Sequence, residues 1–82
     1  MKNKVTVKVR KLGKHKAYGL FHPDTNLIEI HPDLPPLKEL EIYCHEYTHF
    51  TCPDWDEKRV TDNSKKLAKF LWKQNYRKVK NK

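Results

Sequence analysis

Two histidines and a glutamate form the most chemically suggestive group in this chain. His45, Glu46 and His49 fit the pattern H-E-x-x-H inside a mainly apolar stretch, residues 40–50. If the stretch is helical, one turn separates the two imidazoles, which then project from the same face. Such a pair can bind one Zn²⁺ from one side, and Glu46 can accept a proton from a water on that ion. The pattern therefore predicts a zinc site suited to hydrolysis.

The residues around this pattern favour a helix over about 35–51. Pro35 and Pro36 fit the first turn of a helix, and Pro53 disfavours helical backbone at Cys52. Apolar side chains cover most sides, as expected of a helix buried in a domain: Leu40, Ile42, Tyr43, Cys44, Tyr47 and Phe50. A core helix that merely carries two histidines is the alternative. Burial of two imidazoles and a carboxylate without a partner is costly, which favours the metal site.

The N-terminal part of the chain has the pattern of short strands, within about residues 4–31. Valines alternate with polar residues over 5–9, which indicates a half-buried strand. Pro, Asp and Asn gather at the turn 22–26, between apolar runs on either side, so 17–31 is expected to form a hairpin that ends in a strand over 27–30. We expect a small three-stranded antiparallel sheet.

A second long helix is expected over about 55–77, followed by a basic tail at 78–82. Its inward stripe would consist of residues at helical spacing: Val60, Ser64, Leu67, Ala68 and Leu71. The fold class is therefore α+β, with a sheet followed by two helices. We expect one minimal domain over 1–82, because 82 residues can form only a thin core.

Charge is concentrated at the two ends of the chain. Residues 1–16 carry seven Lys or Arg and no acid, and residues 65–82 carry eight and no acid, within a net charge of +8. These ends suit nucleic acid or another anionic partner, although a solvated basic face is the preferred explanation. The acid-rich middle, 17–64, suits a cation.

Cysteine usage and hydropathy bear on location. Cys44 and Cys52 lie eight positions apart, too far for a disulfide on one helix, and are expected to be small buried hydrophobes. Neither a signal peptide nor a membrane-spanning stretch is recognisable. We expect an intracellular, cytoplasmic protein that does not enter the membrane. Its oligomeric state cannot be predicted.

A catalytic zinc site needs a third protein ligand besides the two histidines. The pattern H-E-x-x-H-x-x-G-x-x-H is excluded, because Cys52 and Trp55 occupy its Gly and His positions. Glu57 is the first choice, because it shares the inward stripe of the second helix and a short turn would return it to His45 and His49. The alternative for Glu57 is a capping role, paired with Asp54.

Other residues compete with Glu57 as the third ligand. If the helix continued to Cys52, this residue would lie on nearly the same side of the helix axis as the histidines. Pro53, however, disfavours regular helix at Cys52. Asp54 and Asp56 are further alternatives. His22 and His31 each precede Pro-Asp in turns, where a histidine needs no metal.

On these residues the chain resembles minimal gluzincin-type zinc metallopeptidases, similar to SprT-like and ImmA/IrrE-like domains and to short zincin-like proteins of phages. The resemblance covers about half of the chain, and its specific part is the H-E-x-x-H pattern from His45 to His49. It implies a small sheet packed on two helices, Zn²⁺ on His45, His49 and Glu57, and Glu46 as general base. It also implies that an edge strand, assigned to 27–30, aligns an extended peptide.

Two functions follow as hypotheses. The first is a zinc-dependent peptidase acting on a peptide or protein, in which Tyr76, Tyr47 or His31 supplies a further oxyanion donor. The second is a non-catalytic, zinc-stabilised module that contacts nucleic acid or an acidic protein through its basic ends.

Overall fold

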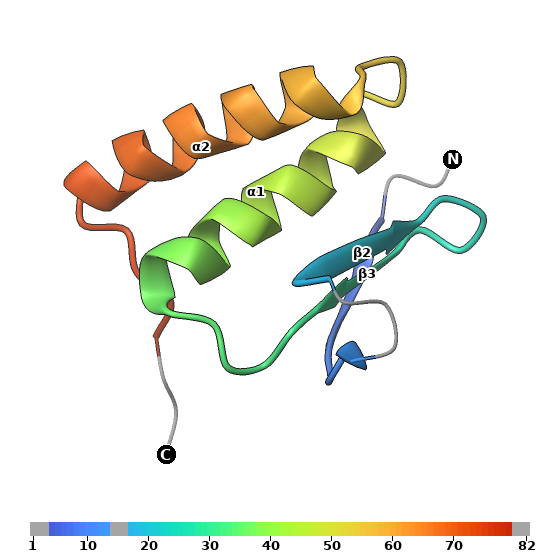
Figure 1. The fold of residues 1–82 in the computed structure, drawn as a ribbon, viewed down its shortest axis with the longest axis horizontal. Helices are drawn as coiled ribbons and strands as arrows, with labels where there is room; N and C mark the ends of the chain where they lie inside the picture. The colour runs from blue at the N-terminus through green and yellow to red at the C-terminus, as the bar shows by residue number, and fades with distance from the viewer. Residues whose placement is uncertain (1–3, 14–16, 80–82) are drawn as a thin grey trace.

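The computed structural model describes residues 4–13 and 17–79, and it has the expected α+β class. Three short strands precede two helices (Figure 1): β1 (Thr6–Val9), β2 (Gly19–His22), β3 (Leu27–Ile30), α1 (Pro36–Thr51) and α2 (Glu57–Lys73). The sheet lies on one side of α1 and α2 on another, so α1 is the element that joins the other two parts of the fold.

The sheet is mixed, so the expectation of a purely antiparallel sheet is wrong. Its strand order is β1-β3-β2, with β3 antiparallel to β2 and parallel to β1. The predicted hairpin is present, since β2 and β3 pair around the turn at 23–26, where Asn26 adopts a left-handed conformation with φ 52°. β1 and β2 are consecutive in the chain but are not neighbours in the sheet, because β3 lies between them.

The strand β1 is more exposed than its alternating pattern predicts. Val7 and Val9 pair in register with Ile28 and Ile30, so all four share one face of the sheet. Ile28 and Ile30 are 1% and 0% exposed, whereas Val7 and Val9 are 42% and 47% exposed. The difference arises because α1 packs on β2 and β3 but not on β1, within the described residues. The pattern identified the correct face, but the helix does not cover all of it.

The helix α1 begins and ends as the prolines predict. Pro35 is its N-cap, Pro36 is its first residue, and the backbone N–H of Cys52 closes the last turn onto the carbonyl of Thr48 at 2.7 Å. Its sheet-facing side contributes Ile42 to a core with Ile28 and Ile30. Partly buried apolar residues surround that core: Val5, Phe21, Leu34 and Tyr43.

The helix α2 packs along α1 and is shorter than predicted at both ends. Val60, Ser64 and Ala68 are buried as expected, but Leu67 is exposed, because it lies at the margin of the stripe. Asp56, rather than Asp54, caps the helix, and its carboxylate accepts a hydrogen bond from the N–H of Arg59 at 2.8 Å.

The C-terminal end of α2 is set by Asn75. This residue has φ 68°, and the two N–H groups that follow the cap bond back into the last turn: Asn75 to the carbonyl of Trp72 at 3.0 Å, and Tyr76 to that of Leu71 at 3.1 Å. This is a Schellman-type ending, and it stops the helix at Lys73 rather than at residue 77. Neither helix in the described part of the chain is both long and apolar enough to cross a lipid bilayer.

Candidate metal centre

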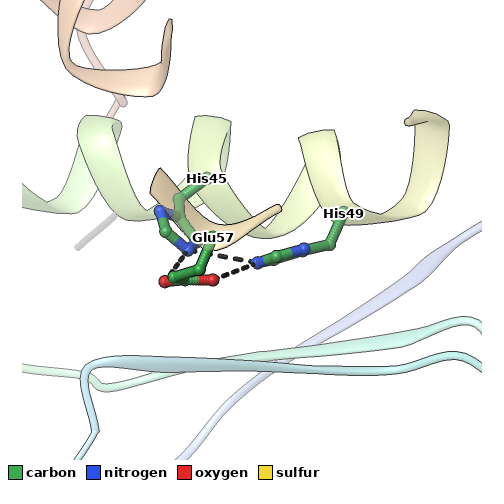
Figure 2. Close-up of side chains that lie close together, drawn as sticks. All are labelled: His45, His49 and Glu57. Atoms are coloured by element: carbon green, nitrogen blue, oxygen red, sulfur yellow. Dashed lines mark hydrogen bonds and ion pairs between the residues drawn. The ribbon is translucent and has the colours of Figure 1, made fainter. Parts of the chain in front are cut away.

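The helix α1 presents His45 and His49 on one face, one turn apart. Their Nε2 atoms lie 3.2 Å from each other, and their ring centroids are 4.9 Å apart. Figure 2 shows both rings extending from the helix toward a common point. Burial lowers the pKa of His45, and the neighbouring His49 acts in the same direction. A lowered pKa favours the neutral imidazole, which is the form that binds a metal.

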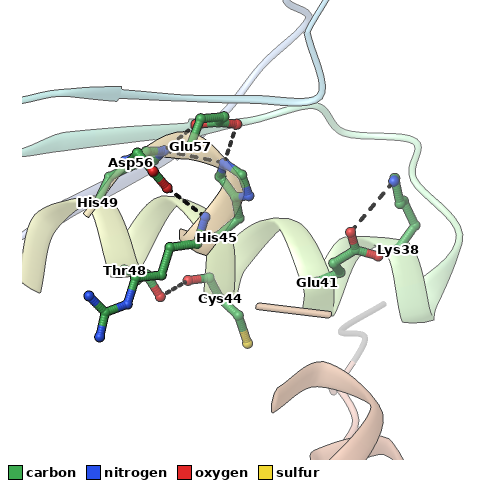
Figure 3. A network of polar contacts seen from close by, with 9 residues as sticks. Lys38, Glu41, Cys44, His45, Thr48, His49, Asp56 and Glu57 are labelled. Carbon is green, nitrogen blue, oxygen red and sulfur yellow. Dashed lines mark hydrogen bonds and ion pairs between the residues drawn. The ribbon is translucent and has the colours of Figure 1, made fainter. Parts of the chain in front are cut away.

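Glu57 brings a carboxylate from α2 to the same point. Its Oε2 lies 3.0 Å from Nε2 of His45, and its Oε1 lies 3.0 Å from Nε2 of His49 (Figure 2). Glu57 is the first residue of α2, so the short turn after α1 and the Asp56 cap fix where its side chain starts. Figure 3 shows Asp56 directly beside the cluster. The carboxylate is 70% exposed and therefore closes the cluster from the solvent side.

Glu46 is the buried acid of the site. It is 7% exposed and faces the sheet from α1, and no described residue donates a hydrogen bond to its carboxylate. Burial, together with the nearby charge of Glu57, raises its pKa to about 7. A carboxyl group with such a pKa can both accept and release a proton near neutral pH.

A cavity of about 500 Å³ joins these side chains to β2. His45, Glu46, His49 and Glu57 line it from the helices, and Gly19 to Phe21 line it from the strand. The strand approaches α1 closely at Gly19, where an added Cβ would lie 2.6 Å from Cγ2 of Ile42 and 3.1 Å from the Glu46 carboxylate. A side chain at this position would therefore overlap Ile42 and crowd Glu46.

The residues that competed with Glu57 lie outside the three-ligand group. Cys52 caps α1 with its backbone, and its thiol lies 3.7 Å from the hydroxyl of Thr51. The carboxylate of Asp56 is engaged in capping α2. Asp54 lies in the exposed turn between the helices. In the described residues, the group formed by His45, His49 and Glu57 is the one whose ligand atoms all lie within 4.8 Å of one another.

The two turn histidines are engaged elsewhere. Nε2 of His22 lies 2.9 Å from the carboxylate of Glu29 on β3, and Nδ1 of His31 accepts a hydrogen bond from the N–H of Asp33 at 3.4 Å. The side chains considered as oxyanion donors do not line the cavity at the metal centre: Tyr76, Tyr47 and His31. Tyr76 lines a different cavity, beyond the other end of the helices.

The substrate-aligning role expected of residues 27–30 does not fit the sheet. β3 is the central strand, so its backbone pairs on both sides, and the open edge beside the cavity belongs to β2. Sequence reasoning missed the contribution of β2 and of Gly19. A signal was present, because an isolated glycine within a strand often marks close approach of another segment.

The donor set and its spacing fit a zinc ion. Two imidazole nitrogens and one carboxylate oxygen form a ligand combination typical of catalytic zinc, which leaves one position for water. Tetrahedral bonds of ~2.0–2.1 Å would hold ligand atoms about 3.3 Å apart. The separations here are 3.0, 3.0 and 3.2 Å, so closing on an ion would need only a small adjustment.

Comparison with known proteins gives no family. No family model, curated protein or solved structure matches the chain. A function can therefore be inferred only from the chemistry of the site itself.

Proposed function

We propose that this protein is a zinc-dependent metallopeptidase. The proposal assigns His45, His49 and Glu57 as the metal ligands and Glu46 as the general base. One observation carries it: three ligand atoms from two helices converge within 3.0–3.2 Å of one another, beside a buried carboxyl group that faces the same cavity. The resemblance of this arrangement to minimal zincins is part of the proposal.

The buried acid would move the proton in this reaction. Zinc, when bound, would supply a Lewis acid that acidifies a water molecule and polarises the scissile carbonyl. Glu46 would accept the proton of the attacking water and return it to the leaving amine. The surroundings of Glu46 support this role, because burial raises its pKa to about 7 and the residue lines the cavity.

The open edge of β2 is suited to hold an extended peptide. His31 donates to the carbonyl of Tyr18 at 2.8 Å, and in an antiparallel pair the residues bonded to the partner strand alternate with those that are not. Gly19 and Phe21 therefore direct their backbone N–H and C=O groups away from β3, toward the open edge. A peptide paired there would run beside Glu46 and the histidines, and its backbone would supply most of the contacts.

The test combines metal analysis with hydrolysis of an unfolded protein substrate. Wild-type protein is expected to bind one zinc per chain and to cleave the substrate. Glu46→Gln is expected to keep the metal and to lose hydrolysis, because an amide cannot accept the proton. Glu41→Gln is the matched control, since Glu41 lies on the same helix, pairs with Lys38 and is not part of the cavity lining. Hydrolysis by Glu46→Gln at the wild-type rate would exclude this mechanism.

A second candidate function is a zinc-stabilised module that binds nucleic acid. It is favoured by the outer face of α2, where Lys65, Lys66, Lys69 and Lys73 are exposed. No ion pair with an acid is formed by these four within the described residues, whereas Lys58 pairs with Asp62 at 2.9 Å. Such a row of lysines suits phosphates, and an acidic protein would be a related partner.

Salt dependence separates this candidate from the first. Binding to double-stranded DNA should weaken steeply with added salt, and replacing two of the lysines, Lys66 and Lys69, by Gln should reduce the slope by about 2 in a plot of log affinity against log salt. Lys58→Gln is the control, because this lysine is already paired. DNA binding without proteolysis would favour the module over the peptidase.

We also propose an intracellular, cytoplasmic location. Both cysteines are free thiols, and the proposed module function would require access to nucleic acid. Fractionation of cells that express a tagged copy tests the location directly.

A further inference from the structure

A second cavity lies away from the metal centre. It has a volume of about 720 Å³ and is bounded by the start of α1, the end of α2 and the segment 76–78. Its walls are mainly apolar and aromatic: Leu40, Tyr43, Leu71, Trp72 and Tyr76. None of its lining residues also lines the cavity at the metal centre. Its volume is within the range of ~300–1,000 Å³ that is usual for small-molecule sites.

The ending of α2 creates the third wall of this cavity. The left-handed Asn75 turns the chain so that Tyr76, Arg77 and Lys78 return toward α1 (Figure 1). Nζ of Lys78 then donates a hydrogen bond to the hydroxyl of Tyr43 at 3.2 Å and lies 3.6 Å from the carboxylate of Glu39. These contacts hold the returning segment against the first turns of α1.

Charge at this cavity is positive once its internal pair is accounted for. Lys78 and the buried Glu39 offset each other, which leaves the guanidinium of Arg77. That group lies 3.4 Å over the ring of Trp72, and its Nη1 donates to the carbonyls of Trp72 and Tyr76 at 2.8 and 3.3 Å. Its Nε and Nη2 donate to no acceptor in the described residues, so one edge of a fixed guanidinium remains available.

We infer that this cavity binds a small organic acid, a molecule with one carboxylate on an apolar body. The carboxylate would pair with the available edge of Arg77, which suits the planar, two-oxygen geometry of that group. The apolar body would lie between Leu40, Leu71 and the ring of Trp72. This site is independent of the proposed peptidase, because it shares no residue with the metal centre.

The experiment uses octanoate as the probe and Trp72 as the reporter. Replacing Trp55 by Phe leaves Trp72 as the one tryptophan of the chain, so its fluorescence reports on this cavity alone. We expect saturable binding of one octanoate per chain, and weaker binding of octan-1-ol, which has the same apolar body without the charge. Equal affinity for the two probes, or no saturable response to octanoate, would overturn the inference.

Two variants test the assigned residues. Arg77→Gln should weaken octanoate binding by about tenfold or more, since a charge-assisted pair is lost. Arg59→Gln in the same background is the control, because it removes an arginine charge that lies outside this cavity. Leu40→Phe, which adds no tryptophan, should occupy part of the space and reduce binding while the circular dichroism spectrum stays unchanged.

The outcome can be separated from that of the proposed peptidase. Saturating octanoate should leave the zinc affinity of the wild-type protein unchanged, because none of the proposed metal ligands lines this cavity. Unchanged octanoate affinity in Arg77→Gln would contradict the role of the guanidinium. A short peptide with a free C-terminal leucine that bound more tightly than octanoate would replace the small acid by a peptide terminus as the ligand.

Discussion

At the residue scale, the position of Glu57 is the main reason to assign the two histidines to a metal site. Its two oxygens each lie 3.0 Å from one imidazole, whereas Cys52 is not part of the cluster. Glu57→Ala should therefore lower zinc affinity by at least ~10²-fold, more than is typical for loss of a residue that only supports a ligand. Cys52→Ala should leave it unchanged. Competition with a chromophoric chelator measures both, and an equal loss in the two variants would contradict the assignment.

Glu29 makes stability depend on pH through a carboxylate that is not one of the proposed metal ligands. Hydrogen bonds from Arg10 and then His22 lower its pKa from 4.5 to about 2. Since the folded state holds the proton less tightly than the unfolded chain, this contribution is complete above pH ~4.5 and disappears as the pH falls toward ~2. Urea unfolding should show that wild type loses more stability than Glu29→Gln between pH 6 and pH 2.5. Parallel losses in the two proteins would exclude this role.

The site was more predictable from sequence than its surroundings. The spacing of His45 and His49 is a property of any helix, and Glu57 returns to them because a short turn joins two packed helices. The alternative that paired Glu57 with Asp54 in a helix cap is wrong, because the backbone geometry selects Asp56 as the cap, two residues further along. Interactions along one helix or across one turn are local, so residue spacing alone describes them well.

At the scale of elements, the close approach of β2 to α1 positions Glu46. Gly19→Ala should destabilise the fold by about 1–3 kcal/mol, because the added methyl group would overlap Ile42 and press on Glu46. Gly13→Ala is the matched control, since no atom lies within 4 Å of the Cβ it would gain. Urea unfolding compares the two. Similar stability of both variants would mean that β2 can move away from α1 without loss.

The order and direction of the strands could not be predicted in the same way. The alternation of valines with polar residues predicted β1 and its apolar face, and the turn residues predicted the hairpin of β2 and β3. Neither signal indicates which strands become neighbours, so neither could predict that β3 lies in the centre with β1 parallel to it. Val7 is exposed for a related reason. A strand is buried only if it lies beneath α1, and strand order decides that β2 and β3 do so.

The whole molecule has a small core, so a bound ion would contribute much of its stability. Six apolar residues are buried in the described part of the chain: Leu12, Ile28, Ile30, Ile42, Val60 and Ala68. The proposed ligands come from both helices, and an ion on them would link the end of α1 to the start of α2. Such a link exists only in the folded chain, so metal binding and folding should be coupled.

This coupling predicts a rise in the melting temperature with zinc. A free zinc concentration one hundred times the dissociation constant stabilises the folded state by about 2.7 kcal/mol. In a domain of this size, 1 kcal/mol shifts the melting temperature by ~4–8 °C, so we expect a rise of roughly 10–20 °C. The double variant His45→Ala/His49→Ala should show none, because the ligands are gone while Glu46 and the helices remain. A rise of similar size in that variant would mean that zinc acts elsewhere on the chain.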